Sequence, residues 1–98
     1  MTSAITQGIL ISLGSKLRPI TDERLANTAH IVPQPGLTRE DMGDQGFEAA
    51  IEERRRWLRE HCQGDHLIDP IRQDGRLVGR RYRFEDADDA FSFKLWFG

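Results

Sequence analysis

Residues 67–84, LIDPIRQDGRLVGRRYRF, decide the fold of this chain because they predict a β-hairpin with a definite register. Asp74 and Gly75 form a strong two-residue turn signal, since both central residues of the favoured hairpin turn need a positive φ. The β-type residues on each side of this turn predict two antiparallel strands. Counting outward from the turn pairs Ile71 with Val78, Asp69 with Arg80, and Leu67 with Tyr82.

The predicted hairpin has one mostly apolar face. Side chains alternate between the two faces of a strand, so the six paired residues share a face with Phe84. This face is expected to meet a helix. The opposite face carries Arg72, Arg81 and Arg83 beside Ile68 and Leu77. Pro70 cannot donate a ladder hydrogen bond, which predicts that its strand lies at a sheet edge.

The segment 47–62 predicts a long helix before this hairpin. Its apolar residues recur at helical spacing: Phe47, Ala50, Ile51, Trp57, Leu58 and Cys62. Asp44 is a candidate N-cap, and Gly64 fits the left-handed position that often follows a helix. We expect the helix to pack on the apolar face of the hairpin, with Trp57 largely buried between the two.

The C-terminal segment favours a short helix from Asp86 to about residue 95. Asp86 followed by Asp89 resembles a capping box in which aspartate takes the place of glutamate. The predicted inner face of this helix consists of Ala87, Ala90, Phe91, Lys94 and Leu95. A strand stays open as the alternative, because large apolar residues also alternate at positions 91, 93, 95 and 97.

The first 36 residues predict an N-terminal arm rather than a domain. Residues 5–13 could form a strand, and Thr21 could cap a short helix over residues 22–29. The sequence VPQPG at 32–36 predicts an extended connection, since proline cannot continue a helix. The predicted fold class is therefore α+β: an arm over residues 1–36 and a compact α-β-β-α domain over residues 37–98.

Composition excludes several classes of protein. A chain of 98 residues suits one domain, and a single cysteine, Cys62, excludes a disulfide within the chain. The longest apolar run, Ile9–Ile11, is far too short to span a bilayer. The N-terminus shows no basic segment followed by a long apolar region, so no secretory signal is expected.

No residue pattern here is typical of an enzyme or a cofactor site. His61, Cys62, Asp65 and His66 lie close together, but they lack the two spaced ligand pairs of a structural zinc site. Cys62 lies at the predicted C-terminal end of a helix, where the helix dipole disfavours a thiolate. The chain has neither a nucleophile elbow nor a phosphate-binding glycine loop. We therefore expect no catalytic residue, no metal site and no cofactor.

Arginine outnumbers lysine twelve to two. Arginine binds phosphate and carboxylate groups in bidentate fashion, so an arginine-rich face could hold an anionic partner. Glutamates at 52, 53 and 60 lie within reach of the helical arginines, which favours a solvated, ion-paired helix instead. The net charge of −2 also argues against nucleic acid. The candidate contacts to an anionic partner are Arg55, Arg56, Arg59, Arg81 and Arg83.

Two segments, WLREHCQG at 57–64 and YRFEDADDAFSFKLWFG at 82–98, carry a resemblance. Together they resemble small uncharacterised bacteriophage proteins, in which a helix with a glycine stop precedes an F-x-F-x-D-x-x-D-A-x-x-F-x-L ending. The matching residues are Trp57, Leu58, Gly64, Tyr82, Phe84, Asp86, Asp89, Ala90, Phe93 and Leu95. The resemblance covers about forty residues, implies a phage origin and a shared fold, and implies no activity.

The sequence as a whole predicts a non-enzymatic accessory protein that binds a protein partner, as a regulator or inhibitor of a host or phage machine. Phe93, Trp96 and Phe97 are the candidate binding residues, since one short helix cannot bury all three. A virion structural protein and a nucleic-acid-binding module are the alternatives, and a homo-oligomer stays open. The expected location is the host cytoplasm or the virion, without membrane attachment.

Overall fold

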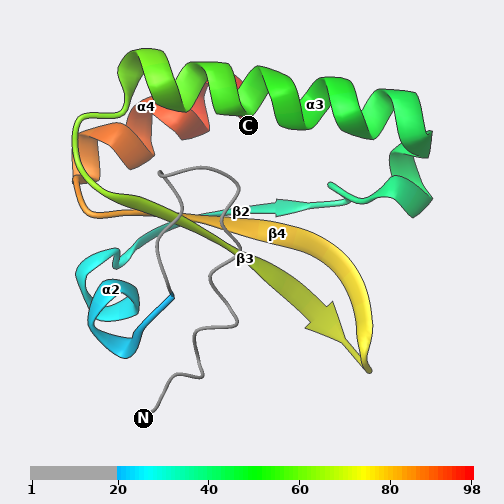
Figure 1. Cartoon of the computed structure of the whole chain (residues 1–98), viewed down its shortest axis with the longest axis horizontal. Coiled ribbons are helices and arrows are strands. Elements are labelled where there is room, and N and C mark those ends of the chain that lie inside the picture. Colours follow the sequence, from blue (N-terminus) through cyan, green and yellow to red (C-terminus); the bar gives the residue numbers. More distant parts are fainter. Residues whose placement is uncertain (1–19) are drawn as a thin grey trace, which may run out of the picture.

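The computed structural model describes residues 20–98, which fold into two helices on one face of an antiparallel sheet. In chain order the elements are α2 (Asp22–Asn27), β2 (His30–Pro35), α3 (Arg39–His61), β3 (His66–Gln73), β4 (Arg76–Phe84) and α4 (Ala87–Phe97). Figure 1 shows α3 and α4 on one side of the sheet and α2 on the other. The predicted α+β fold, with a long helix, a hairpin and a short C-terminal helix, is confirmed. The strand predicted over residues 5–13 lies outside the described residues.

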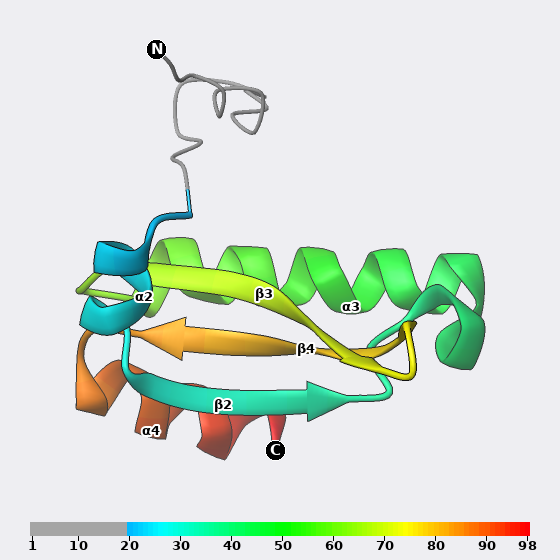
Figure 2. The same cartoon turned by 90° about the horizontal axis from the view of Figure 1, so that it is seen from below.

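The sheet has three strands in the order β2-β4-β3, so β4 is its centre (Figure 2). The sequence predicted only an extended connection at residues 32–36 and an arm that ends at residue 36. Instead β2 pairs with β4 along its whole length, from His30 opposite Phe84 to Pro35 opposite Gly79. The compact unit therefore begins before residue 37. Its strand was hidden from sequence reasoning because prolines are rare inside paired strands.

The prolines of β2 are compatible with pairing because of where their nitrogens point. In an antiparallel ladder, every second residue directs its N–H towards the partner strand. The N–H of Gly36 donates to the carbonyl of Val78 at 2.8 Å. The N–H groups two and four residues before Gly36 therefore also point towards β4. Pro33 and Pro35 fall at the alternate positions, on the outer edge. They remove no ladder bond there, and they block the addition of another strand.

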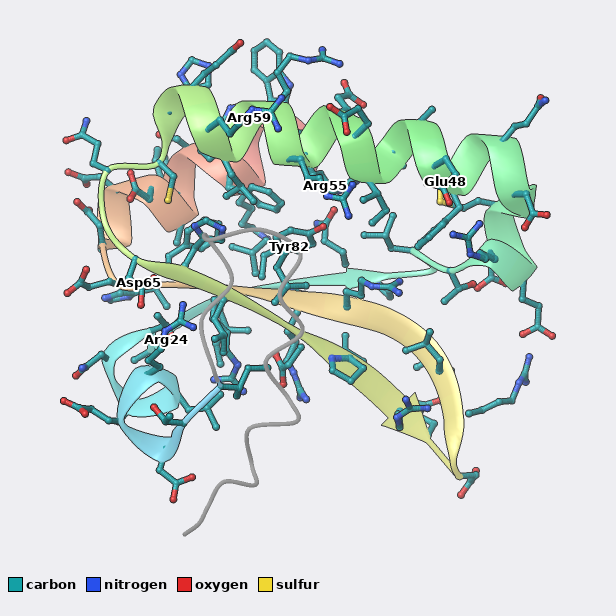
Figure 3. The ribbon with its side chains drawn as sticks, in the orientation of Figure 1. Arg24, Glu48, Arg55, Arg59, Asp65 and Tyr82 are labelled. Carbon is teal, nitrogen blue, oxygen red and sulfur yellow. The ribbon has the colours of Figure 1, made fainter. Side chains whose placement is uncertain are left out.

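The short helix α2 begins after Thr21, as predicted. The Thr21 hydroxyl caps it by accepting a hydrogen bond from the N–H of Arg24 at 3.1 Å. Its position on the sheet is fixed by charge. The Arg24 guanidinium donates to both carboxylate oxygens of Asp65 at 3.0 Å and to the His66 carbonyl at 2.9 Å. Figure 3 shows Arg24 and Asp65 facing each other at this end of β3.

The hairpin turn is confirmed, but the register beyond it is wrong by one residue. Asp74 and Gly75 have φ values of 52° and 77°, as the predicted turn requires. Next to the turn the strands pair as counted, and a β-bulge then falls between Ile71 and Arg72. Ile71 consequently lies opposite Gly79 rather than Val78. One extra residue in β4 turns every β3 side chain beyond it to the other face of the sheet.

This bulge places Asp69 on the face away from α3. Asp69 lies opposite Arg81, not Arg80, and forms ion pairs with Arg81 at 3.0 Å and with Arg83 at 2.9 Å. Leu67, two residues earlier on the same face, is buried on the α2 side of the sheet. Arg80 points to the α3 side, where it donates to the Leu37 carbonyl at 2.8 Å. The predicted Asp69–Arg80 pair is therefore wrong.

The long helix α3 begins earlier than predicted and ends in a different way. Thr38, rather than Asp44, is its N-cap and accepts from the N–H of Asp41 at 3.0 Å. A kink at Gly43, with φ 78°, separates this first turn from the rest of the helix. At the other end, Gly64 is not left-handed as predicted. The carboxylate of Asp89 instead accepts the N–H groups that follow the helix.

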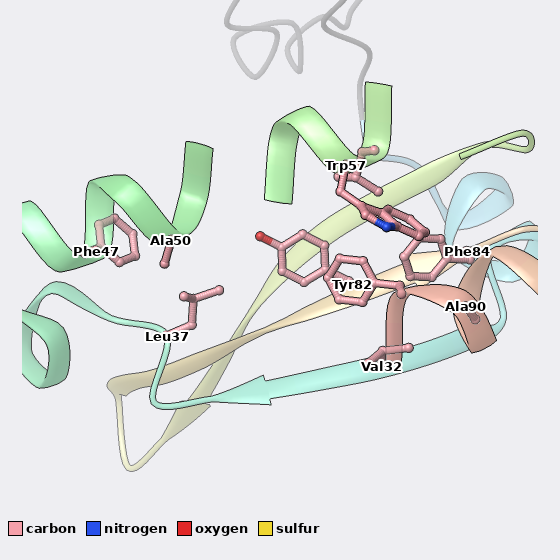
Figure 4. Close-up of a cluster of buried hydrophobic side chains, with 10 residues drawn as sticks. Val32, Leu37, Phe47, Ala50, Trp57, Tyr82, Phe84 and Ala90 are labelled. Atoms are coloured by element: carbon pink, nitrogen blue, oxygen red, sulfur yellow. The ribbon is translucent and has the colours of Figure 1, made fainter. Parts of the chain in front are cut away.

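Aromatic rings from three elements, α3, β4 and α4, meet in the core (Figure 4). Phe93 of α4 is fully buried, and its ring centroid lies 5.5 Å from Trp57, 4.7 Å from Tyr82 and 5.3 Å from Phe84. Trp57 is 7% exposed, which confirms its predicted burial. The predicted C-terminal helix is confirmed as well, although α4 continues to Phe97 rather than ending near residue 95. Its N-cap is Asp86, which accepts from the N–H of Asp88 at 2.8 Å.

Candidate functional site

The outer side of α4 exposes three large apolar side chains. Phe91 is 64% exposed, Leu95 is 72% exposed and Trp96 is 66% exposed. Phe91 and Leu95 are four residues apart, and Trp96 follows directly, so all three lie on the solvent side of a helix that turns once per 3.6 residues. We call these three residues the α4 surface.

The structure corrects the predicted inner face of this helix. Phe91 and Leu95 were expected to face the core, whereas the buried residues of α4 are Asp89, Ala90 and Phe93. The reason is that aromatic or aliphatic residues occupy both sides of the helix, so periodicity alone cannot tell which side is buried. Ala90 is small enough to let α4 approach the sheet, and Phe93 fills the space beside it.

Only one of the three predicted binding residues is well exposed. Phe93 is a core residue and has no surface to offer. Phe97 is partly buried, with its ring 6.2 Å from Trp57 and the Arg54 guanidinium 4.5 Å above it. Trp96 keeps its predicted exposure. Phe91 and Leu95 were missed, although the excess of apolar residues over what one helix face can bury was visible in the sequence.

A hollow of about 470 Å³ lies beside the α4 surface, between α4 and the C-terminal end of α3. Leu95 and Trp96 form one wall, and Trp57 and His61 of α3 form the other. Asp88 also lines it. A hollow next to exposed aromatic side chains suits a protein partner that inserts one of its own side chains.

The α4 surface is held in place by a carboxylate that sequence reasoning assigned to another role. Asp89 was expected to complete a capping box at its own helix. Instead its Oδ2 atom accepts from the N–H groups of Gln63 and Gly64, each at 2.9 Å, and from the Cys62 thiol at 3.4 Å. These bonds join the start of α4 to the end of α3, so the surface is already ordered without a partner.

The candidate arginines do not converge on one face. Arg55 and Arg59 lie on α3, where they pair with Glu52 at 3.9 Å and 3.6 Å (Figure 3). Arg81 and Arg83 lie on the opposite side of the sheet, and Asp69 pairs with both. Arg56 is exposed on α3. The five arginines therefore form no continuous basic patch for a phosphate backbone to follow.

The surroundings of Cys62 do not favour the thiolate form that a nucleophilic cysteine needs. The Cys62 sulfur lies 3.9 Å from Nδ1 of His66, but burial and the nearby carboxylate of Asp89 raise the pKa of the thiol to about 12. A thiol in this state is protonated at neutral pH. Within residues 20–98, no three histidine, cysteine or acidic side chains are placed to hold a metal ion.

The raised pKa predicts slow thiol chemistry. With a pKa of about 12 instead of 9, the folded protein should carry about 1,000-fold less Cys62 thiolate at pH 8. The greater nucleophilicity of a more basic thiolate offsets this by about 25-fold, so reaction with an aromatic disulfide should be at least about 40-fold slower than in urea-unfolded chain.

Stopped-flow absorbance measures both of these reaction rates. Comparable rates in the folded and unfolded protein would contradict the environment described for Cys62. The stabilisation linked to the protonated thiol is complete below pH 9 and is lost as the pH rises towards 12, because the folded form has the higher pKa.

Comparison with known proteins assigns this chain to no family. Known protein families, curated proteins and solved structures were each searched, and none matches this chain. Among residues 20–98, no helix has both the length and the apolar character that crossing a membrane requires.

Proposed function

We propose that this protein is a small non-enzymatic accessory protein that acts by binding a protein partner through the α4 surface. The observation that carries the proposal is the exposure of Phe91, Leu95 and Trp96 side by side on an ordered helix. Large apolar side chains that gather at one exposed region of a soluble protein often mark a binding surface.

The residue types suit a protein interface. Tryptophan and other aromatic residues dominate the binding energy of protein interfaces, and arginine lies mainly at their edges. Burying one large apolar side chain contributes about 1.5–3 kcal/mol, so the three residues of the α4 surface can together supply the centre of a specific interface.

The biological setting of the proposal rests on the resemblance to small bacteriophage proteins. A protein of this kind would regulate or inhibit a host or phage machine. A structural role in the virion is the second candidate, because assembly contacts would use the same apolar surface. Nucleic-acid binding is disfavoured, since the arginines lie on two faces and most of them are paired with carboxylates.

Site-specific photo-cross-linking tests the proposal directly. A photoreactive amino acid at position 95 should yield a discrete protein adduct in cells of the natural host. The same amino acid at position 73, an exposed site near the hairpin turn and far from α4, serves as the matched control. The adduct should resist nuclease and disappear with protease.

Two outcomes would contradict the proposal. Identical adducts at positions 95 and 73 would mean that the contacts are not specific to α4. A nuclease-sensitive adduct would mean that the partner is a nucleic acid. An adduct with a capsid or tail protein would select the virion role within the same proposal.

A further inference from the structure

A second hollow, of about 300 Å³, lies between α3 and the β3 side of the sheet, and it is separate from the α4 surface. Its apolar wall is made by Phe47, Ile51 and Leu58 of α3 and by Ile68 of β3. No residue of the α4 surface lines it. We call it the α3–β3 hollow. Its volume is at the lower end of the range for small-molecule sites.

Tyr82, which lines this hollow, has a hydroxyl that forms no hydrogen bond with the described residues. The residue as a whole is 2% exposed, but its hydroxyl oxygen is not among the fully buried unpartnered atoms and keeps access to the hollow. In Figure 4 the Tyr82 oxygen points away from Trp57, towards the side of the core where Ala50 lies. A hydroxyl without a protein partner on the wall of a hollow is free to bond to a water molecule or to a ligand there.

The protonation state of Tyr82 makes it a donor. Burial raises its pKa, and the positive charges of Arg54, Arg80 and Arg55 only partly oppose this effect. The hydroxyl therefore stays protonated at neutral pH and can donate one hydrogen bond. Its ligand has to bring an acceptor.

The charges around the hollow favour a ligand with a single negative charge. Arg39 is already paired with Glu48, and Arg80 donates to a backbone carbonyl and stacks on the Phe47 ring at 4.9 Å. Arg55 is less engaged, because its ion pair with Glu52 is 3.9 Å long and its side chain is 63% exposed. In Figure 3, Arg55 and Tyr82 lie on facing sides of the space between α3 and the sheet.

We propose that the α3–β3 hollow binds a small monocarboxylate with an apolar body. The carboxylate accepts hydrogen bonds from the Tyr82 hydroxyl and the Arg55 guanidinium. The apolar body lies against Ile51, Leu58 and Ile68. A phosphate carries more charge than one available arginine neutralises, and it would leave the apolar wall uncovered.

A nuclear magnetic resonance titration with 4-phenylbutyrate tests this site. We expect saturable shifts of the backbone amides of Ile51, Leu58 and Ile68. The neutral amide of the same acid should bind at least about tenfold more weakly, because a charge-assisted hydrogen bond is about twice as strong as a neutral one. Inorganic phosphate should bind more weakly than the carboxylate.

Two variants and a matched control localise the carboxylate. Arg55→Gln and Tyr82→Phe should each weaken 4-phenylbutyrate binding about tenfold. Arg56→Gln removes the same charge from the next residue, which does not line the hollow, and should change the affinity by less than about twofold. Tyr82→Phe should melt no lower than the wild type, since the hydroxyl it removes has no partner among the described residues.

Three results would overturn the proposed site. The first is a titration with 4-phenylbutyrate that does not saturate, and the second is an affinity for the amide or for phosphate equal to that for 4-phenylbutyrate. The third is an equal loss of 4-phenylbutyrate affinity in Arg55→Gln and Arg56→Gln. Arg55→Gln keeps the test valid even if Tyr82→Phe fails to fold, because Arg55 is an exposed residue. Trp96→Ala should bind 4-phenylbutyrate like the wild type. The carboxylate site and the proposed protein-binding function can therefore fail independently.

Discussion

Replacing Trp57 with alanine is expected to lower the free energy of unfolding by about 3–5 kcal/mol. The indole is almost fully buried and contacts Phe93 edge-to-face, with ring planes at 82°. Its removal leaves a cavity in the core between α3 and α4. A domain of this size has a total stability of roughly 5–15 kcal/mol, so the variant would be close to unfolding.

Urea denaturation followed by circular dichroism measures this loss, and Trp96→Ala is the matched control. Both variants replace a tryptophan with alanine, but Trp96 lies on the surface. Trp96→Ala should change the free energy of unfolding by less than about 0.5 kcal/mol. Equal unfolding midpoints for Trp57→Ala and the wild type would show that Trp57 is not part of the core.

The second large effect concerns binding. Trp96→Ala should weaken the affinity for the protein partner by about 2–3 kcal/mol, or roughly 30- to 150-fold, as is typical of a tryptophan at the centre of an interface. The reason is the loss of the largest exposed apolar side chain beside the hollow between α3 and α4. Isothermal titration calorimetry with the cross-linked partner measures the change.

Arg81→Ala combined with Arg83→Ala gives the contrasting control for this binding experiment. These residues lie on the far side of the sheet and pair with Asp69, so their removal should change the affinity little. A double variant that abolishes binding while Trp96→Ala retains it would reverse the assignment of the binding face. It would also favour an anionic partner.

Local signals in the sequence predicted the parts of the fold that depend on local chemistry. The positive φ values at Asp74 and Gly75, the Asp86 cap and the helical spacing that buries Trp57 each involve residues close together in the chain. Each of these features depends on hydrogen bonds or apolar spacing within a few residues. Local sequence therefore predicts them without knowledge of the tertiary contacts.

The features that were predicted wrongly depend on distant residues. The bulge beside Ile71 shifts the hairpin by one residue, although the turn itself is as predicted. The strand β2 is stabilised by its pairing with β4, and its prolines are tolerated only because they face outward. Neither fact can be read from the local sequence, since both are decided by the register between strands.

The candidate site illustrates the same limit on one helix. Phe91, Phe93, Leu95 and Trp96 are all apolar, so the sequence shows that α4 has more apolar surface than it can bury. Phe91, Leu95 and Trp96 stay outside because the buried side of α4 carries Asp89, Ala90 and Phe93, and Asp89 bonds to the end of α3. A buried carboxylate with a long-range role looks like an ordinary helix cap in the sequence.

Hydrogen exchange in the presence and absence of the cross-linked partner tests the central claim most directly, because it maps the contact without any mutation. We predict slower exchange in α4, over residues 87–97, and at the C-terminal end of α3. Slower exchange confined to β3 and β4, around Arg81 and Arg83, with α4 unchanged, would contradict the claim that this protein binds its partner through the α4 surface.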